Sequence, residues 1–115
     1  MVQNIPSRMR VVEVVKDGPV ERLTVDQRVV PTPLPQELLV KVAGCGVNRA
    51  DVMQRQGHYP PPVGASDILG LEISGTVVAI GNAVSNWEVG DQVCSVVTGG
   101  GYAEFCVVPA PQCLP

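Results

Sequence analysis

Hydrophobic and polar residues alternate with a period of two along much of the chain, which is the pattern of β-strands. The clearest example lies between Gly70 and Val93, where one set of alternating positions holds Ile73, Gly75, Val77 and Ala79. The intervening positions also carry apolar residues, so we expect a strand with both faces largely covered. Glycine weakens the interior of a strand, and Gly75 therefore predicts a bulge or a close approach of another backbone.

Similar patterns predict further strands at residues 10–15, 23–30, 38–47, 91–97 and 102–108. Turn-forming glycine, proline, asparagine and aspartate residues separate these runs. One short helix is expected within residues 49–56, because Asn48 is a good N-cap and Gly57 can end the helix. The pattern thus predicts a mainly β fold of six or seven strands with one or two short helices, arranged as a closed or nearly closed barrel.

The composition agrees with one small domain and excludes several classes of partner. The chain has 115 residues, of which 12 are glycine and 11 are proline, a size suited to one modest core. Its net charge is -3 and no basic cluster occurs, which disfavours a nucleic acid or an anionic membrane as partner. No apolar run reaches the length of a membrane span.

The cysteines and the chain ends suggest a compartment and a domain division. The four cysteines are Cys45, Cys94, Cys106 and Cys113. Their spacing matches neither a zinc site nor a C-x-x-C redox motif, and residues 1–8 lack the apolar core of a signal peptide. We therefore expect free thiols in the cytoplasm, a flexible arm at residues 1–8 and one domain at residues 9–115. The proline-rich last residues are typical of a linker to another domain.

Three sequence motifs together resemble one known family. They are G-V-N-R-A-D-V-M-Q-R-Q-G-H-Y-P-P-P at 46–62, G-x-E-x-x-G-x-V-x-x-x-G followed by G-D-x-V within 70–93, and G-G-Y-A-E-F-C-V-V-P at 100–109. The set resembles the N-terminal GroES-like catalytic domain of the medium-chain dehydrogenase/reductase superfamily. Within it, the first motif is similar to that of zinc-independent NAD(P)H:quinone oxidoreductases of the stress-inducible branch.

This resemblance implies a fold and a missing partner domain. The expected fold is a GroES-like, partly open β-barrel. In the family a Rossmann domain follows and binds the dinucleotide, but its G-x-G-x-x-G turn does not occur in this sequence. The cofactor implied by the resemblance is NADPH, bound mainly by that missing domain.

The resemblance also argues against zinc. Zinc-dependent relatives place a cysteine ligand in the first motif and a histidine ligand before the glutamate of the second. Here these positions hold Asn48 and Leu71, and the cysteine-rich lobe for structural zinc does not occur. Catalytic zinc takes about three protein ligands, so we predict that the protein binds no zinc or other metal.

Two residues are candidates for direct roles. Asn48 can cap the helix, and the resemblance implies that its amide lies beside the nicotinamide ribose; both roles are compatible. Tyr59 can pack as a loop aromatic against the prolines that follow. The resemblance instead implies that Tyr59 faces substrate and nicotinamide, where a protonated phenol can donate to a carbonyl oxygen that gains charge.

Other conspicuous residues are interpreted as structural. Asp51 and Glu72 are charges in otherwise packed stretches, for which Arg49 or Lys41 are candidate partners. The glycines at 99–101 precede a strand rather than a helix. They are therefore interpreted as a hairpin loop and not as a phosphate cradle.

The expected function is hydride transfer from NADPH to a quinone or related conjugated carbonyl, without metal, by the full-length protein. These 115 residues alone are expected to be inactive. An enoyl-thioester or alkenal reductase on the same scaffold is one alternative, and a non-enzymatic GroES-like binding or assembly module is another. The resemblance further implies a homo-oligomer with a small-molecule substrate, and no nucleic-acid or membrane partner.

Overall fold

The computed structural model describes residues 5–58 and 60–115 and confirms a mainly β fold. The elements in chain order are β1 (Arg8–Val15), β2 (Arg22–Val29), β3 (Glu37–Cys45), α1 (Arg49–Arg55), β4 (Glu72–Ile80), β5 (Gln92–Val96), β6 (Phe105–Pro109) and the 3-10 helix η1 (Ala110–Gln112). The strands and the helix lie where the alternation and the turn residues predict them, with ends that differ by only a few positions.

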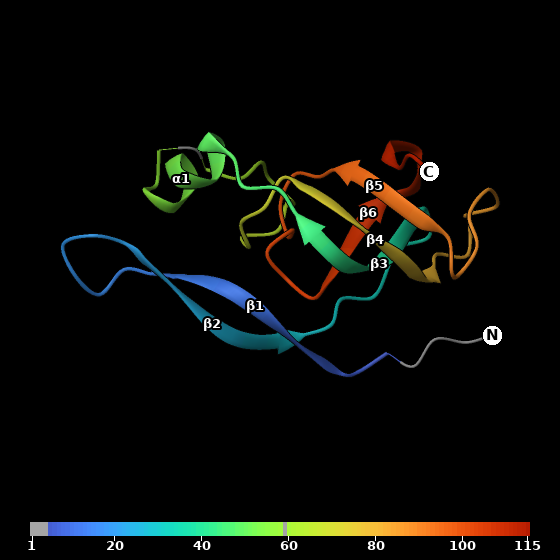
Figure 1. Ribbon diagram of the computed structural model, residues 1–115, viewed down its shortest axis with the longest axis horizontal. Helices are drawn as coiled ribbons and strands as arrows, with labels where there is room; N and C mark the ends of the chain where they lie inside the picture. The colour runs from blue at the N-terminus through green and yellow to red at the C-terminus, as the bar shows by residue number, and fades with distance from the viewer. Residues whose placement is uncertain (1–4, 59) are drawn as a thin grey trace.

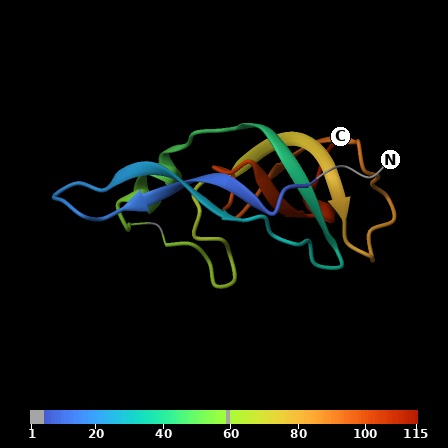
Figure 2. The ribbon, with the colours of Figure 1, turned by 90° about the horizontal axis from the view of Figure 1, so that it is seen from below.

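The strands form two antiparallel sheets. β1 and β2 make a two-stranded hairpin, and the second sheet has the order β5-β4-β3-β6. The hairpin lies along one side of the larger sheet, and its tip extends below α1 (Figure 1). Seen from below, the hairpin lies in front of that sheet (Figure 2). The hairpin and the larger sheet are separate sheets. A bridge between Val11 and Ala103 connects them along one side, so the barrel is partly open and not closed.

The pairing of β3 with β4 is irregular at the predicted position. The register shifts between Leu39 and Val40 and again between Val42 and Gly44. A Cβ atom on Gly75 would overlap the backbone carbonyl oxygen of Lys41. Only glycine fits at this position, which confirms the close backbone approach expected from the sequence.

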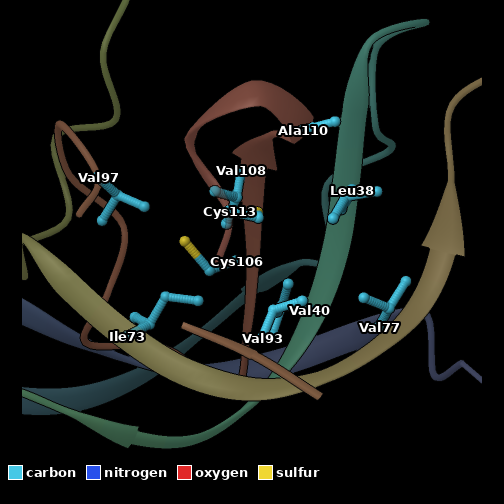
Figure 3. Packing of buried hydrophobic residues seen from close by; sticks show 10 residues of the cluster. All are labelled: Leu38, Val40, Ile73, Val77, Val93, Val97, Cys106, Val108, Ala110 and Cys113. Atoms are coloured by element: carbon cyan, nitrogen blue, oxygen red, sulfur yellow. The ribbon is translucent and has the colours of Figure 1, made fainter. Parts of the chain in front are cut away.

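Two clusters of apolar side chains cover the two faces of the larger sheet. Figure 3 shows the first cluster, which consists of Leu38, Val40, Ile73, Val77, Val93, Val97, Cys106, Val108, Ala110 and Cys113. The second lies between this sheet and the hairpin and consists of Met9, Val11, Leu39, Ile68, Val78 and Phe105. Successive β3 residues thus point into different clusters, as the strand period requires.

Strand β3 is buried where it begins and exposed where it ends. Leu38 and Val40 are both 0% exposed. Gly44 and Cys45 are exposed, and Val47 just beyond the strand is 78% exposed. The polar residues that follow β3 in the chain, Asn48 and Arg49, therefore lie next to its exposed end.

Candidate functional site

An open groove of about 820 Å³ lies at the exposed end of β3. Its walls come from residues 44–46, from 72–74 at the start of β4, from 94–98 along and after β5, and from Gln112 and Leu114. The volume falls in the range of roughly 300–1,000 Å³ that small-molecule sites occupy. Because β6 pairs with β3 only as far as Lys41, the last part of β3 is free to form a wall of this groove.

Gly46 lets the side chain of Glu72 lie across this wall. A Cβ atom on Gly46 would overlap the Glu72 carboxylate. The backbone N–H of Gly46 also donates to the carbonyl oxygen of Glu72 at 3.1 Å. The absence of a side chain at Gly46 therefore determines where the negative charge of Glu72 sits in the groove.

Asn48 occupies the predicted N-cap position of α1, with extended backbone angles of φ -129° and ψ 161°. Its backbone N–H donates to Asp51 Oδ2 at 2.9 Å. The Asn48 side-chain amide Nδ2 donates to Glu72 Oε1 at 3.3 Å. An amide and a carboxylate thus meet beside the groove.

Asp51 is buried at 2% exposure and makes a contact that the sequence did not indicate. Its Oδ2 atom accepts a hydrogen bond of 2.9 Å from the hydroxyl of Tyr102. The sequence suggested Arg49 or Lys41 as partners of Asp51 and Glu72; the structure instead shows Tyr102 and Asn48 in these roles. The suggestion was wrong because charge complementarity along the chain does not reveal which side chains meet in the fold.

The Asp51 carboxylate also affects two neighbouring acids. Burial, together with the hydrogen bond to Asp51 and its charge, raises the pKa of Tyr102 well above its usual value of 10.0. Although Cys45 is exposed as a residue, partial desolvation of its thiol, assisted by the charge of Asp51, raises the thiol pKa. Both groups therefore stay protonated at neutral pH. Tyr102 was missed as a site residue, although its place beside the glycines of the third motif was a usable signal.

Tyr59 lies outside the described residues, and its role stays a prediction. The chain before it is described: His58 donates its backbone N–H to Met53 O at 2.8 Å, which completes the end of α1. Gly57 has a φ of +83° and ends the helix as expected. Residues 99–101 form a loop before β6, but β5 and β6 lie at opposite edges of the sheet and do not pair, so the interpretation as a hairpin loop was wrong.

The groups near Asn48 do not have the donor chemistry of a zinc site. Within residues 5–58 and 60–115, no group of three or more His, Cys, Asp and Glu side chains has the arrangement needed to hold a metal ion. A neutral amide at Asn48 and an aliphatic side chain at Leu71 cannot replace a thiolate and an imidazole.

Within residues 5–58 and 60–115, α1 is too short to span a bilayer and no membrane-spanning helix is found.

Known proteins are similar to this chain in sequence and in fold. The family model described as "Alcohol dehydrogenase GroES-like domain" matches residues 34–115. A Mus musculus protein named "Synaptic vesicle membrane protein VAT-1 homolog-like" is 35% identical over 101 residues, which cover 88% of this chain and 24% of that protein. The Mus musculus "Quinone oxidoreductase" is 33% identical over 114 residues, covering 92% of this chain and 34% of that protein.

Solved structures of other proteins have a similar fold. The crystal structure described as a putative NADPH:quinone reductase from Mesorhizobium loti has a TM-score of 0.79 at 29% identity, covering 98% of this chain and 38% of that one. This chain therefore spans well under half the length of the relatives it matches. From the family match and the curated relatives together, the chain belongs to the alcohol dehydrogenase GroES-like domain family, as quinone oxidoreductases of the medium-chain dehydrogenase/reductase superfamily do.

Proposed function

We propose that this chain is the catalytic-domain portion of a zinc-independent oxidoreductase that transfers hydride from NADPH to a quinone or related conjugated carbonyl. The observation that carries the proposal is the groove of about 820 Å³ with the Asn48 amide and the Glu72 carboxylate beside it. A Rossmann domain outside this chain would bind most of the dinucleotide. The 115 residues alone would then have no reductase activity.

The donors and acceptors around Asn48 fit a nicotinamide ribose. An asparagine side chain has two N–H donors and a carbonyl acceptor. One N–H is held by Glu72 Oε1, which fixes the plane of the amide and leaves one donor and the acceptor for ribose hydroxyls. NADPH supplies the hydride when bound, and this domain supplies orientation, hydrogen bonds and the wall of the site.

A small-molecule quinone, a cytoplasmic location and a homo-oligomeric full-length protein are parts of the same proposal. The described structure supports the location through its four cysteines, all of which are free thiols. The net charge of -3 gives no support to a nucleic-acid partner.

The central experiment compares NADPH oxidation by the full-length protein and by the 115-residue chain, with a quinone or an enoyl thioester as acceptor. Quinone-dependent oxidation by the full-length protein alone is the expected result. A preference for the enoyl thioester would move the function to that reductase class. No oxidation with either acceptor would support a non-enzymatic binding module and overturn the proposal.

Tyr59 is the proposed hydrogen-bond donor to the substrate oxygen. A donor that interacts more strongly as negative charge grows stabilises the transition state more than the ground state. In the full-length protein, Tyr59→Phe should lower kcat on the preferred substrate by roughly tenfold or more, with a smaller loss for quinones than for enoyl substrates. The melting temperature should stay nearly unchanged.

Steady-state kinetics and a thermal melt of Tyr59→Phe separate the two roles of this residue. Unchanged kcat on both substrate classes would show that Tyr59 only packs against the prolines. A melting temperature lower by several degrees would instead assign the hydroxyl to the fold.

The protein should retain no stoichiometric zinc. The reason is the ligand chemistry: Asn48 and Leu71 stand where thiolate and imidazole ligands are needed. Elemental analysis after extensive dialysis checks this expectation. One molar equivalent of zinc that survives dialysis would contradict both the prediction and the assignment of Asn48 to the cofactor.

A further inference from the structure

Asp51 is the one buried carboxylate among the described residues, and it connects two distant parts of the chain. Its Oδ2 atom accepts the backbone N–H of Asn48 and the hydroxyl of Tyr102, each at 2.9 Å. The other oxygen, Oδ1, is buried without a hydrogen-bond partner in the described residues. This burial costs free energy, which the hydrogen bonds of Oδ2 to the start of α1 and to Tyr102 offset.

Tyr102 is fixed to the sheets independently of this contact. Its backbone N–H donates to Leu69 O at 2.8 Å, and its carbonyl oxygen accepts the N–H of Val12 at 2.9 Å. The backbone beside it approaches Gly70 so closely that a Cβ on Gly70 would overlap Gly101 and Tyr102. Tyr102 is thus a rigid point of the framework from which its hydroxyl reaches α1.

The placement of helix α1 depends on its hydrogen bond to Tyr102. It has seven residues, and Asp51 is the only buried one among them. The segment that leads into it contains Gly46, which has no side chain, and the exposed Val47, so neither residue is an apolar anchor. The Asp51 carboxylate and the Tyr102 hydroxyl that holds it therefore help to set the position of Asn48 at the start of the helix, together with the Gly46–Glu72 backbone hydrogen bond.

We propose that Asp51 and Tyr102 are a positioning pair that holds Asn48, and through it the Asn48–Glu72 contact, in the geometry that receives the nicotinamide ribose. The inference rests on the proposed function of Asn48. Both residues act through the backbone N–H of Asn48 and the start of α1. Because Tyr102 stays protonated at neutral pH, it remains a donor to Asp51 across the working range of an enzyme.

The test is Tyr102→Phe in the full-length protein, which deletes one hydroxyl and keeps the ring. We expect the KM for NADPH to rise by roughly fivefold while kcat changes by less than about twofold, because loose positioning mainly weakens cofactor binding. Glu104→Gln is the matched control, since Glu104 lies two residues away and makes an exposed ion pair with Arg10. That control should leave KM unchanged.

A double-mutant cycle shows whether the effect passes through Asn48. In an Asn48→Ala background, Tyr102→Phe should no longer change the KM for NADPH. A full additional rise in that background, or a normal KM in the single variant, would overturn the inference. Asp51→Asn provides a second variant: it removes the charge that strengthens both hydrogen bonds and places an NH2 group where Oδ1 is buried without a partner, so it should raise KM in the same direction.

Amide hydrogen exchange separates failure of this inference from failure of the proposed function. Tyr102→Phe should speed exchange of the Asn48 backbone N–H by about tenfold or more, whether or not the protein is an enzyme. Wild-type protein without NADPH-dependent activity would overturn the proposed function and with it the cofactor role of the pair. Unchanged exchange at Asn48 would overturn the positioning role itself.

Discussion

The two ends of strand β3 belong to one run of nine residues but have opposite surroundings. At the first end, β3 pairs with β4 on one edge and with β6 on the other as far as Lys41. At the second end only β4 remains as a partner, up to Cys45. Leu38 is completely buried, whereas Val47, just past the strand, is 78% exposed.

This difference separates stability from binding along a single element. Where both edges are paired, the side chains of β3 enter two apolar clusters, one of which Figure 3 shows. Where one edge is free, small residues and polar groups replace the core, and the groove forms. A strand can therefore carry a site at one end because its other end is firmly held.

Truncating the buried end should have the largest effect on stability. Leu38→Ala removes a fully buried side chain from the first cluster and should lower the free energy of unfolding by about 3 kcal/mol. Val47→Ala, at the exposed end, should change it by less than about 0.5 kcal/mol. Urea denaturation monitored through Trp87, which packs against the same cluster, measures both.

The informative result is the ratio between the losses of unfolding free energy in Leu38→Ala and in Val47→Ala. Similar losses at both positions would show that the exposed end of β3 is covered in solution, and the groove would not be an open site. Val47→Ala, which keeps an apolar side chain, serves as the matched control for Leu38→Ala.

An intermediate effect is expected at Gly46. Gly46→Ala places a methyl group against the Glu72 carboxylate, which is the mobile end of a flexible side chain and can move aside. The free energy of unfolding should therefore fall by less than about 1 kcal/mol, within the range of ordinary surface changes. The displaced carboxylate would release the Asn48 amide, so NADPH affinity of the full-length protein should fall by roughly fivefold.

The same substitution at Gly75 supplies the contrast. There a methyl group would meet the backbone carbonyl of Lys41, which cannot move without disturbing the sheet, and the cost should be about 2 kcal/mol. Calorimetric titration with NADPH and urea denaturation of both variants give the comparison. A larger stability loss at Gly46 than at Gly75 would mean that the start of the groove is as rigid as the core.

The sequence predicted the strands and helix α1 well because their signals are local. Alternation located β4, and the glycine within it correctly indicated a close backbone approach at Gly75. The capping position of Asn48 also followed from its immediate neighbours. Each of these features depends on residues within a few positions, where backbone preferences act directly.

The parts that could not be predicted depend on contacts between distant residues. Asp51 and Tyr102 are 51 positions apart, and no periodicity connects them. The groove likewise depends on where β6 stops pairing with β3, at Lys41. A charge pattern alone suggested Arg49 for Asp51, but the fold placed a neutral hydroxyl there. Tertiary geometry decides such pairs, and local preference does not.

The smallest effect is expected at an exposed contact between the hairpin and the loop before β4. Arg28 on β2 bonds Glu13 through Nε at 2.6 Å and Asp67 through Nη1 at 2.7 Å. The hydrogen bond from Arg28 lowers the pKa of Asp67 below its usual value of 3.8. A lowered folded-state pKa stabilises the fold above the unfolded value, and this contribution disappears as the pH falls through the folded value.

Asp67→Asn should therefore lower the free energy of unfolding at about pH 7 by less than about 1 kcal/mol, because the Asp67 side chain is 71% exposed and solvent screens the pair. At an acidic pH below the folded-state pKa of Asp67, where the wild-type carboxylate is protonated, the two proteins should be nearly equally stable. Asp17→Asn is the control, since Asp17 forms a similar exposed pair with Arg22, only five residues away in the same hairpin, and should have a smaller effect because this pair joins no distant segments. Urea denaturation at both pH values tests the sign. A difference between Asp67→Asn and wild type that stays constant from neutral to acidic pH would show that the Arg28–Asp67 contact acts through shape or packing and not through charge. In that case the hairpin would be held to the loop before β4 by packing, as the buried end of β3 is. The charge of the Arg28–Asp67 pair would then contribute nothing to the stability of the fold.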